Sequence, residues 1–456
     1  MFDNFIENNK DEILNNLSEL IKIPSVSQNI NDQKNPFGEE CTNALNYILS
    51  LGKSMGFRTK NIDNYCGYIE FGEGNDLVGI IGHLDVVPAL AEDGWTTPPF
   101  SPEIRNGKLF GRGSIDDKGP VIASLYAMKA VKDSCQVSKR VRLIIGLNEE
   151  KDWKCINYYK EREEWPSIGF SPDANFPGIF AEKGILSIEL KHNFSIKNFE
   201  ILDVSTNNNA INVVPKYASI TLKSLQNSTN VNFKNKINNN NISISTLEDD
   251  VFKIESFGVA AHAAHPELGV NAIKLLVEFL LEYFEFNDDF LKTIYDYGLF
   301  DITSPKFMSD ETLKDESGIL TSNVAVIEFK DTELFLKINL RVPVTIPLDE
   351  IQNKYINLYN DVEISRLSYQ DPLYVEKNSY LVKTLVDIFN KKSGLNAIPI
   401  AIGGGTYARA FENFISYGVT MPGQKDMCHQ VDEFIEINDL ILASKIYSEA
   451  IYELAK

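Results

Sequence analysis

The arrangement of hydrophobic and polar positions divides the chain into stretches of helical and of strand-like periodicity. Apolar residues recur at helical spacing over residues 4–23, and a second helix is expected over 39–55. A third helix is expected over 117–132. Strands are expected over 66–71, 77–83 and 141–147. The last of these is apolar except at Arg142, as in a strand buried on both faces. Strands that alternate with helices predict an α/β domain in the first part of the chain.

The middle of the chain has a different pattern. Short segments of alternating polarity dominate residues 184–255, which is typical of strands with one solvated face. The asparagine- and lysine-rich residues 228–241 predict an exposed loop. A helix over 269–285 and a pair of strands near 323–341 are expected to follow.

The end of the chain returns to α/β character, with helices expected over 378–392 and 437–455. We therefore expect two domains, one inserted into the other. The first is discontinuous and comprises residues 1–183 and 375–456, and the inserted α+β domain comprises 184–374.

Composition narrows the class of protein. The 456 residues are 43% hydrophobic, enough for buried cores, and the net charge of -20 argues against nucleic acid or an anionic membrane as a partner. No apolar run is long enough to span a bilayer. The five cysteines are scattered without a CxxC motif, and the N-terminus lacks the order of a signal peptide. These features predict a cytoplasmic protein.

The expected strand over 77–83 ends in an unusual pair, His83 and Asp85 of GHLDVVP. A His-x-Asp pair alone is weak evidence, because a histidine at a strand end is more often hydrogen-bonded to a nearby loop. Further acidic and imidazole groups also lie at the ends of predicted elements. They are Asp116 and Asp117 in GRGSIDDKGP, Glu149 and Glu150 in GLNEE, Asp173 in FSPDANFP, and His429 in DMCHQ.

Each of these residues has an ordinary explanation when taken singly. Asp116 or Asp117 could cap a helix, and Asp173 could be a turn residue. Together they place imidazoles and carboxylates where α/β proteins bind ligands. Such a donor set without thiolates suits zinc, manganese or cobalt. Two close cations can share a carboxylate and activate a water between them, and a further carboxylate then serves as general base.

The motifs GHLDVVP, GRGSIDDKGP, NEE, SPDANFP, GVAAHAAHPELGVNA, GGGTYAR and MCHQ occur in the order seen in M20-type metallopeptidases, and the chain resembles that family over most of its length. It is most similar to the PepV-type Xaa-His dipeptidases, with which it shares DGWTTPPF, EEWPSIGFSPDANFP and IYSEAIYELAK. The resemblance implies a catalytic domain with a mixed sheet flanked by helices, and an inserted lid domain.

The resemblance implies a role for each residue of the predicted metal site. One metal would be held by His83, Asp116 and Asp173, and the other by Asp116, Glu150 and His429, with Asp116 bridging. Asp85 would fix the orientation of the His83 ring. Glu149 would take a proton from the water between the metals and pass it to the leaving amine. The Asp116–Asp117 peptide bond is expected to be cis.

In the inserted domain the resemblance implies residues that contact the substrate. His262 would stabilise the charge that develops on the scissile carbonyl oxygen. Asn212 and Arg341 would hold the terminal carboxylate, for which the planar guanidinium is well suited. Gly404 and Gly405 of GGGTYAR would offer backbone N–H groups to it, although a tight turn before a helix explains these glycines equally well.

The function implied is hydrolysis of unblocked dipeptides, with two divalent metal ions as cofactors and a small peptide as substrate. Zinc is the favoured metal, with manganese and cobalt as alternatives. A deacylase of N-acyl amino acids or a broader aminopeptidase is the alternative on the same scaffold, and a non-catalytic peptide-binding protein is a third reading. A monomer is expected. NNNAINVVP has asparagines where relatives often have glycines, which predicts a reshaped turn on the substrate side.

Overall fold

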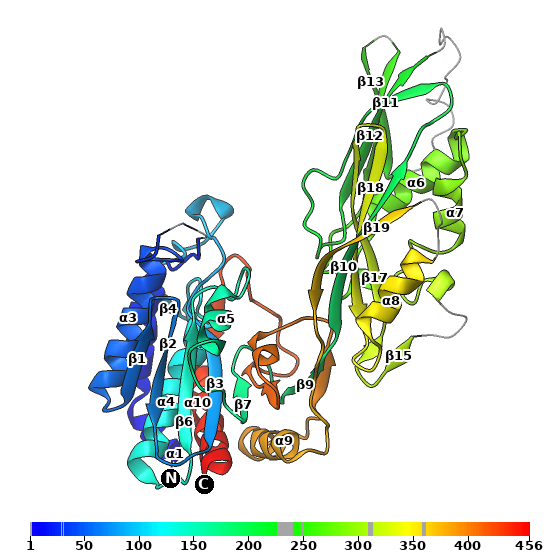
Figure 1. Ribbon diagram of the computed structural model, residues 1–456. Helices are drawn as coiled ribbons and strands as arrows, with labels where there is room; N and C mark the ends of the chain where they lie inside the picture. The colour runs from blue at the N-terminus through cyan, green and yellow to red at the C-terminus, as the bar shows by residue number, and fades with distance from the viewer. Residues whose placement is uncertain are drawn as a thin grey trace. The chain divides into compact units, whose positions relative to one another are not determined.

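The computed structural model describes residues 2–28, 30, 32–225, 240–248, 250–308, 313–357 and 362–456. The chain folds into two compact units (Figure 1). The first unit comprises Met1–Phe180, Tyr374–Ile400 and Gly405–Lys456, and the second comprises Ala181–Leu373 and Ala401–Gly404. Most of the expected asparagine-rich loop, residues 228–239, lies outside the described residues.

The N-terminal segment forms two helices in place of the single helix expected over 4–23. Helix α1 spans Phe2–Asn8 and α2 spans Lys10–Ile21. The chain leaves the helical conformation at Asn9, whose side-chain amide donates to the Phe5 carbonyl at 2.7 Å. An asparagine side chain that bonds to the backbone competes with helix continuation, which explains the break. Helix α3 spans Glu39–Ser54, as expected.

The first unit is built on a mixed sheet with strand order β1-β2-β6-β3-β7-β22-β9. The strands are β1 (Arg58–Ile62), β2 (Cys66–Phe71), β3 (Leu77–His83), β6 (Arg140–Gly146), β7 (Ile168–Ser171), β9 (Ile179–Glu182) and β22 (Phe414–Ser416). The pairs β3–β6, β3–β7 and β22–β7 are parallel, whereas β1–β2 and β2–β6 are antiparallel. Strands β20 (Leu373–Tyr374) and β21 (Ile400–Ile402) lie where the chain passes between the units.

The helices that cover this sheet come from both ends of the chain. They are α4 (Lys118–Ser134), α5 (Lys154–Lys160), α9 (Tyr380–Ser393) and α10 (Ile437–Ala455). Helix α4 packs against β3 and against α10, and α3 packs on β1 and β2. The side chains of β3 and nearly all of those of β6 are buried, and both strands contact α4 and α10.

Two small sheets bring distant loops to the end of the central sheet. Strands β4 (Glu103–Arg105), β5 (Lys108–Phe110) and β24 (Phe434–Glu436) form one, in the order β24-β5-β4. Strands β8 (Ala174–Asn175) and β23 (Val419–Thr420) form the other. The short 3-10 helices η1 (Ala91–Asp93) and η5 (Tyr407–Ala410) lie in the connecting loops.

The second unit contains two four-stranded antiparallel sheets. One has the order β17-β18-β10-β19 and the other β11-β12-β14-β13. Their strands are β10 (Gly184–Asn193), β11 (Phe199–Ser205), β12 (Tyr217–Ser224), β13 (Ile242–Glu248), β14 (Val251–Phe257), β17 (Thr321–Lys330), β18 (Glu333–Val342) and β19 (Glu363–Gln370). The strand positions agree with the alternating patterns read from the sequence.

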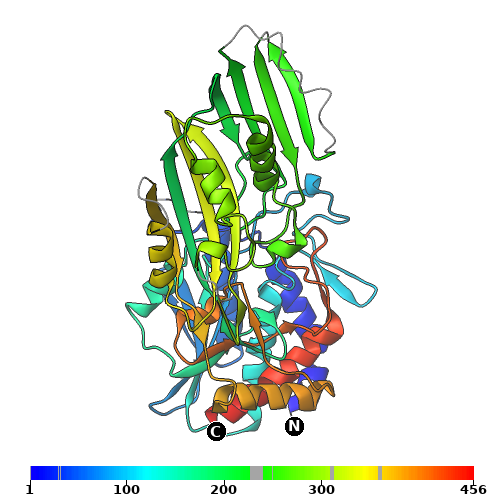
Figure 2. The same cartoon turned by 90° about the vertical axis from the view of Figure 1, so that its right-hand side faces the viewer.

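Helices cover one side of these strands. They are α6 (Ala272–Tyr283), α7 (Phe290–Asp296) and α8 (Leu348–Ile356). In Figure 2 the green helices α6 and α7 lie in front of the strands of this unit. Buried residues such as Leu276, Ile220 and Leu336 form one continuous core between helices and sheets. Shorter elements are η3 (Pro266–Leu268), η4 (Lys306–Met308), β15 (Lys314–Asp315) and β16 (Gly318–Ile319).

The predicted α/β fold class, with a mixed sheet flanked by helices, is confirmed. Among the described residues, no helix is long and apolar enough to cross a membrane. The parallel pairing of β3 with β6 sets His83 opposite Gly146, so the residues that follow these two strands emerge at the same end of the sheet.

Candidate metal centre

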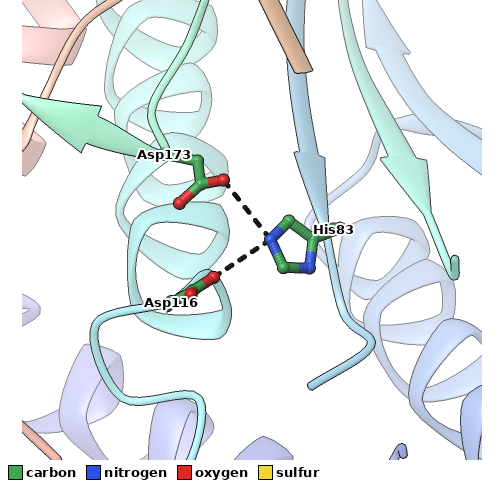
Figure 3. Close-up of side chains that lie close together, drawn as sticks. All are labelled: His83, Asp116 and Asp173. Atoms are coloured by element: carbon green, nitrogen blue, oxygen red, sulfur yellow. Dashed lines mark ion pairs between the residues drawn. The ribbon is translucent and has the colours of Figure 1, made fainter. Parts of the chain in front are cut away.

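The first cluster of candidate ligands surrounds the His83 ring, at the end of β3 (Figure 3). His83 Nε2 lies 3.1 Å from Asp116 Oδ1 and 3.4 Å from Asp173 Oδ2. Asp116 comes from the loop before α4, and Asp173 lies in the turn between β7 and β8. His83 is fully buried, so its ring is held in one place by the surrounding protein. These three residues could hold a metal ion, and we name them the first triad.

The second cluster shares Asp116 with the first. His429 Nε2 lies 3.0 Å from Asp116 Oδ2 and 3.0 Å from Glu150 Oε1. Asp116 therefore presents one carboxylate oxygen to each histidine. We name Asp116, Glu150 and His429 the second triad, which could also hold a metal ion. A carboxylate shared in this way is the arrangement that a bridging ligand between two cations requires.

Backbone hydrogen bonds fix the positions of these side chains. His83 Nδ1 lies 2.9 Å from the Asp85 carbonyl oxygen and 3.5 Å from its carboxylate Oδ1. The Asp85 carboxylate accepts hydrogen bonds from the N–H groups of Glu149 and Glu150, each at 3.1 Å. Asp85 thus contacts the His83 ring mainly through its carbonyl, and its carboxylate joins the GHLD and NEE segments.

Asp117 also holds the first triad. The Asp116–Asp117 peptide bond is cis, and Asp117 Oδ2 accepts a hydrogen bond from the His83 N–H at 3.0 Å. A Cβ atom at Gly82 would clash with that same oxygen. The glycine of GHLD is therefore required for close approach of the Asp117 carboxylate to β3.

The electrostatics of the cluster are those of a crowded acidic site. Burial raises the pKa of Glu149 well above its usual range and that of Glu150 to about 7. Burial alone would lower the pKa of His429, but its hydrogen bonds with Asp116 and Glu150 raise it to about 11. The carboxylates around His83 likewise outweigh burial and raise its pKa. Positive charge is therefore favoured between these groups, whether from protons or from cations.

The residues present fit divalent metal ions. His83 Nε2 and Asp116 Oδ1 are buried, and neither makes a well-directed hydrogen bond to any part of the chain that the structure describes. Buried polar atoms without such partners are costly unless something else satisfies them. The ligand atoms of each triad lie within 4.8 Å of one another, and nitrogen and carboxylate oxygen donors suit zinc, manganese or cobalt.

The predicted substrate residues of the second unit fall into two groups. Asn212 and His262 are neighbours, because the Ala263 N–H donates to the Asn212 carbonyl at 2.8 Å and Val213 forms a β-bridge with His262. Arg341 lies elsewhere in the unit, where Nη1 donates to the Gly403 carbonyl at 2.8 Å and Nε donates to Asn339 at 2.9 Å. The guanidinium therefore holds the first glycine of GGGTYAR.

The other glycines of that motif are divided between the units. Gly404 belongs to the second unit and Gly405 to the first. The motif also supplies Tyr407, which is buried with its ring 5.9 Å from that of His83. GGGTYAR thus contributes to packing around the first triad, which the resemblance did not imply.

The asparagines of NNNAINVVP have a structural explanation. Asn207 and Asn208 have φ angles of 53° and 57°, in the left-handed region that asparagine tolerates better than most residues. The Asn209 side chain donates to the carbonyls of Ala210, Val213 and Ala325 at 2.9–3.0 Å. The turn that precedes Asn212 is therefore formed without glycine.

Sequence reasoning missed a buried ion pair between Arg112 and Glu433. Arg112 Nη1 donates to Glu433 Oε2 at 2.6 Å, and the two residues are 321 positions apart. Opposite charges in GRGSIDD and in VDEFIE, each a few residues from a predicted ligand, were a sequence indication that the two loops meet.

Two triads of imidazoles and carboxylates lie at the end of the central sheet of an α/β unit. This arrangement is typical of metal-dependent hydrolases. The family model for Peptidase family M20/M25/M40 matches residues 79–453. The chain belongs to this family, so it is a peptidase of a metal-dependent class. The M20 membership inferred from the motifs is confirmed.

Individual relatives cover nearly the whole chain. The protein named "Putative dipeptidase YtjP" of Bacillus subtilis (strain 168) is 38% identical over 458 residues, which is 98% of each chain. A "Putative dipeptidase" of Staphylococcus epidermidis is 34% identical over 469 residues, 98% of this chain and 97% of that protein. The crystal structure of human carnosine dipeptidase 1 is 14% identical, with a TM-score of 0.63 over 99% of this chain and 98% of that one, and shows the shared fold.

Proposed function

We propose that this protein is a dipeptidase that hydrolyses unblocked dipeptides with two divalent metal ions, zinc being the favoured metal. The observation that supports this most is the shared Asp116, whose two carboxylate oxygens face His83 and His429 at 3.1 and 3.0 Å. The names of the relatives that cover the whole chain point to the same substrate class.

The first and second triads would hold the two cations. When bound, the cations would polarise the scissile carbonyl and lower the pKa of water, which supplies a nucleophile near neutral pH. His83 and Asp116 are buried, whereas 51% of the His429 side chain is exposed. Bulk water would therefore be excluded more from the first triad than from the second, and electrostatic interactions would be stronger there than at the surface.

Glu149 is the proposed general base. Its backbone N–H is held by Asp85 Oδ1 at 3.1 Å, directly beside the ligand Glu150. Burial raises its pKa, so its carboxylate has more affinity for a proton than a surface glutamate has. Glu149 would accept a proton from the attacking water and donate it to the leaving amine nitrogen, so that the C–N bond breaks with a neutral amine as product.

Residues of the second unit are proposed to bind the substrate, as the family resemblance implies. His262 would donate a hydrogen bond to the scissile carbonyl oxygen as negative charge develops there. Asn212, Arg341 and Gly404, together with Gly405 of the first unit, would hold the terminal carboxylate. A monomeric state and a cytoplasmic location stay predictions from the sequence.

The function is tested with four substrates, which are an unblocked dipeptide, a tripeptide, an N-acetyl amino acid and β-Ala-His. Each is incubated with protein treated with a chelator and then with zinc, manganese or cobalt added back. Cleavage confined to the dipeptides and restored by metal is expected, and the rates rank the metals.

Other outcomes identify the alternatives. Cleavage of the N-acetyl amino acid alone would show a deacylase, and cleavage of the tripeptide would show a broader aminopeptidase. Metal binding without cleavage of any of the four would support a non-catalytic peptide-binding protein and overturn the proposal.

A further inference from the structure

The buried pair Arg112–Glu433 lies beside both segments that supply the second triad. Glu433 has no exposed surface, and only 5% of the Arg112 side chain is exposed. Arg112 lies four residues before Asp116, and Glu433 lies four residues after His429. Removing two charges from water is costly, and such a pair does not by itself stabilise a fold more than apolar side chains would.

Both members of the pair contact the backbone of the second triad. Glu433 Oε1 accepts hydrogen bonds from the N–H groups of Ile115 at 3.0 Å and Asp116 at 3.3 Å. Arg112 Nη2 donates to the His429 carbonyl at 3.4 Å. His429 has a φ of 64°, a left-handed conformation that is unfavourable for a residue with a side chain unless its surroundings support it.

We propose that Arg112 and Glu433 are positioning residues that fix Asp116 and His429 relative to one another, and so set the affinity of the second triad for its cation. This inference rests on the proposed function, because it requires both triads to bind divalent cations. One carboxylate holds the Asp116 backbone, one guanidinium holds the His429 backbone, and the 2.6 Å ion pair joins them.

The first triad depends less on this pair. His83 is fixed at the end of β3 by the sheet and by Asp117. Asp173 directly precedes β8, whose partner is β23. Of the first triad, only Asp116 is held by Glu433. Loss of the pair should therefore weaken cation binding at the second triad more than at the first.

The unit contains a matched control, the ion pair between Arg142 on β6 and Glu70 on β2. It is similarly buried, with 4% and 8% of the two side chains exposed, and Arg142 Nη2 lies 2.6 Å from Glu70 Oε2. Arg142 also donates to the Tyr159 hydroxyl at 2.8 Å. This pair joins two sheet strands, so its loss tests what a purely structural ion pair contributes.

The experiment compares Arg112→Lys with Arg142→Lys in the full chain. Lysine keeps the charge but cannot bridge two acceptors with a planar fork. Zinc is titrated into metal-depleted protein in competition with a chromophoric chelator, and both binding constants are fitted. For Arg112→Lys we expect the second zinc to bind about 10- to 100-fold more weakly, the range typical of groups that orient metal ligands, with the first changed about threefold at most.

Arg142→Lys should leave both zinc affinities within about threefold of wild type, while its thermal unfolding midpoint falls. A second variant, Glu433→Gln, keeps an oxygen for the Ile115 and Asp116 N–H groups but loses the charge that holds Arg112. This variant should bind the second zinc ion about tenfold more weakly than the wild type. Circular dichroism confirms that each variant is folded.

Three results would overturn the inference. They are wild-type affinity for the second zinc in both Arg112→Lys and Glu433→Gln, an equal loss in Arg142→Lys, and failure of both pair variants to fold. Binding of fewer than two zinc ions by the wild type would instead contradict the proposed function itself. The two failures are thereby distinguishable.

Discussion

The two units of this protein place their candidate functional residues in different ways. In the first unit, five side chains from five separate segments converge into two triads that share Asp116, with ligand atoms within 4.8 Å in each. In the second unit, Asn212 and His262 are joined by backbone pairing, whereas Arg341 is bound to Gly403. The first unit has a site that is already assembled within one compact body.

This difference agrees with the roles proposed for the two sets of residues. Metal ligands need mutual positions that are fixed to a few tenths of an ångström, and a buried sheet edge with backbone hydrogen bonds supplies that. Residues that bind only the substrate need to meet the substrate rather than one another. Variants of the metal-binding set should lose metal, whereas variants of the substrate-binding set should lose only turnover.

The largest effect is expected for Asp116→Asn. The amide is close in shape but removes the negative charge that both triads share, so both metal affinities should fall by more than about 100-fold. Activity should fall by at least about 10⁴-fold, since enzymes exceed the uncatalysed rate by larger factors than this. Metal content by mass spectrometry and dipeptide hydrolysis measure the two effects.

The neighbouring Asp117→Asn is the control for that experiment. Asparagine can still accept the hydrogen bond from the His83 N–H, so metal content should be retained. Retention of both metals by Asp116→Asn would contradict the assignment of Asp116 as the shared ligand.

The next largest effect is expected for Glu149→Gln. A glutamine cannot accept the proton from water, and general-base catalysis typically contributes about 10²- to 10⁴-fold, so kcat should fall by that factor. Both metals should stay bound, because Glu149 is outside both triads. Glu150→Gln, one residue further, should lose the second metal as well. Full turnover by metal-loaded Glu149→Gln would exclude Glu149 as the base.

His262→Ala tests the second unit in the same way. Loss of a hydrogen-bond donor to a developing oxyanion should lower kcat by about 10²- to 10³-fold and leave metal affinity unchanged. His265→Ala is a close control, because His265 lies three residues away, is 62% exposed and pairs with Glu267. Equal activity of the two variants would remove His262 from the mechanism.

Much of this structure could be predicted from the sequence because it rests on local patterns. The apolar run of VRLIIGL predicted β6, and the strand ending in His83 predicted where a ligand would lie. The family resemblance then grouped ligands that are far apart in the chain, and the structure brings the same residues together.

The remaining features depend on contacts that no local pattern records. The break between α1 and α2 comes from one side chain, Asn9, bonding back to its own helix. The contact of Arg341 with Gly403 and that of Arg112 with Glu433 join residues 62 and 321 positions apart. The contact between Asp85 and His83 could be predicted from the sequence. The hydrogen bonds that the Asp85 carboxylate accepts from the N–H groups of Glu149 and Glu150 could not.

The smallest expected effect is on the free energy of unfolding. Its measurement tests whether the two units unfold independently. Asn271 caps α6 in the second unit, where its side chain accepts from the N–H groups of Ile273 and Lys274 and donates to Val324. Ser379 caps α9 in the first unit by accepting from the Val382 N–H. Replacing either cap by alanine should cost about 1 kcal/mol, since loss of a cap leaves a helix N–H unsatisfied.

Calorimetry of metal-loaded protein separates the two caps. A loss of about 1 kcal/mol shifts the unfolding midpoint of a domain of this size by about 2–4 °C. We expect Asn271→Ala to lower the midpoint without changing zinc affinity, because it acts on a unit that supplies no ligand to either triad. Ser379→Ala acts on the metal-bearing unit, so added zinc should offset part of its loss by binding the folded state. Equal protection of both variants by zinc would show that the two units unfold as one.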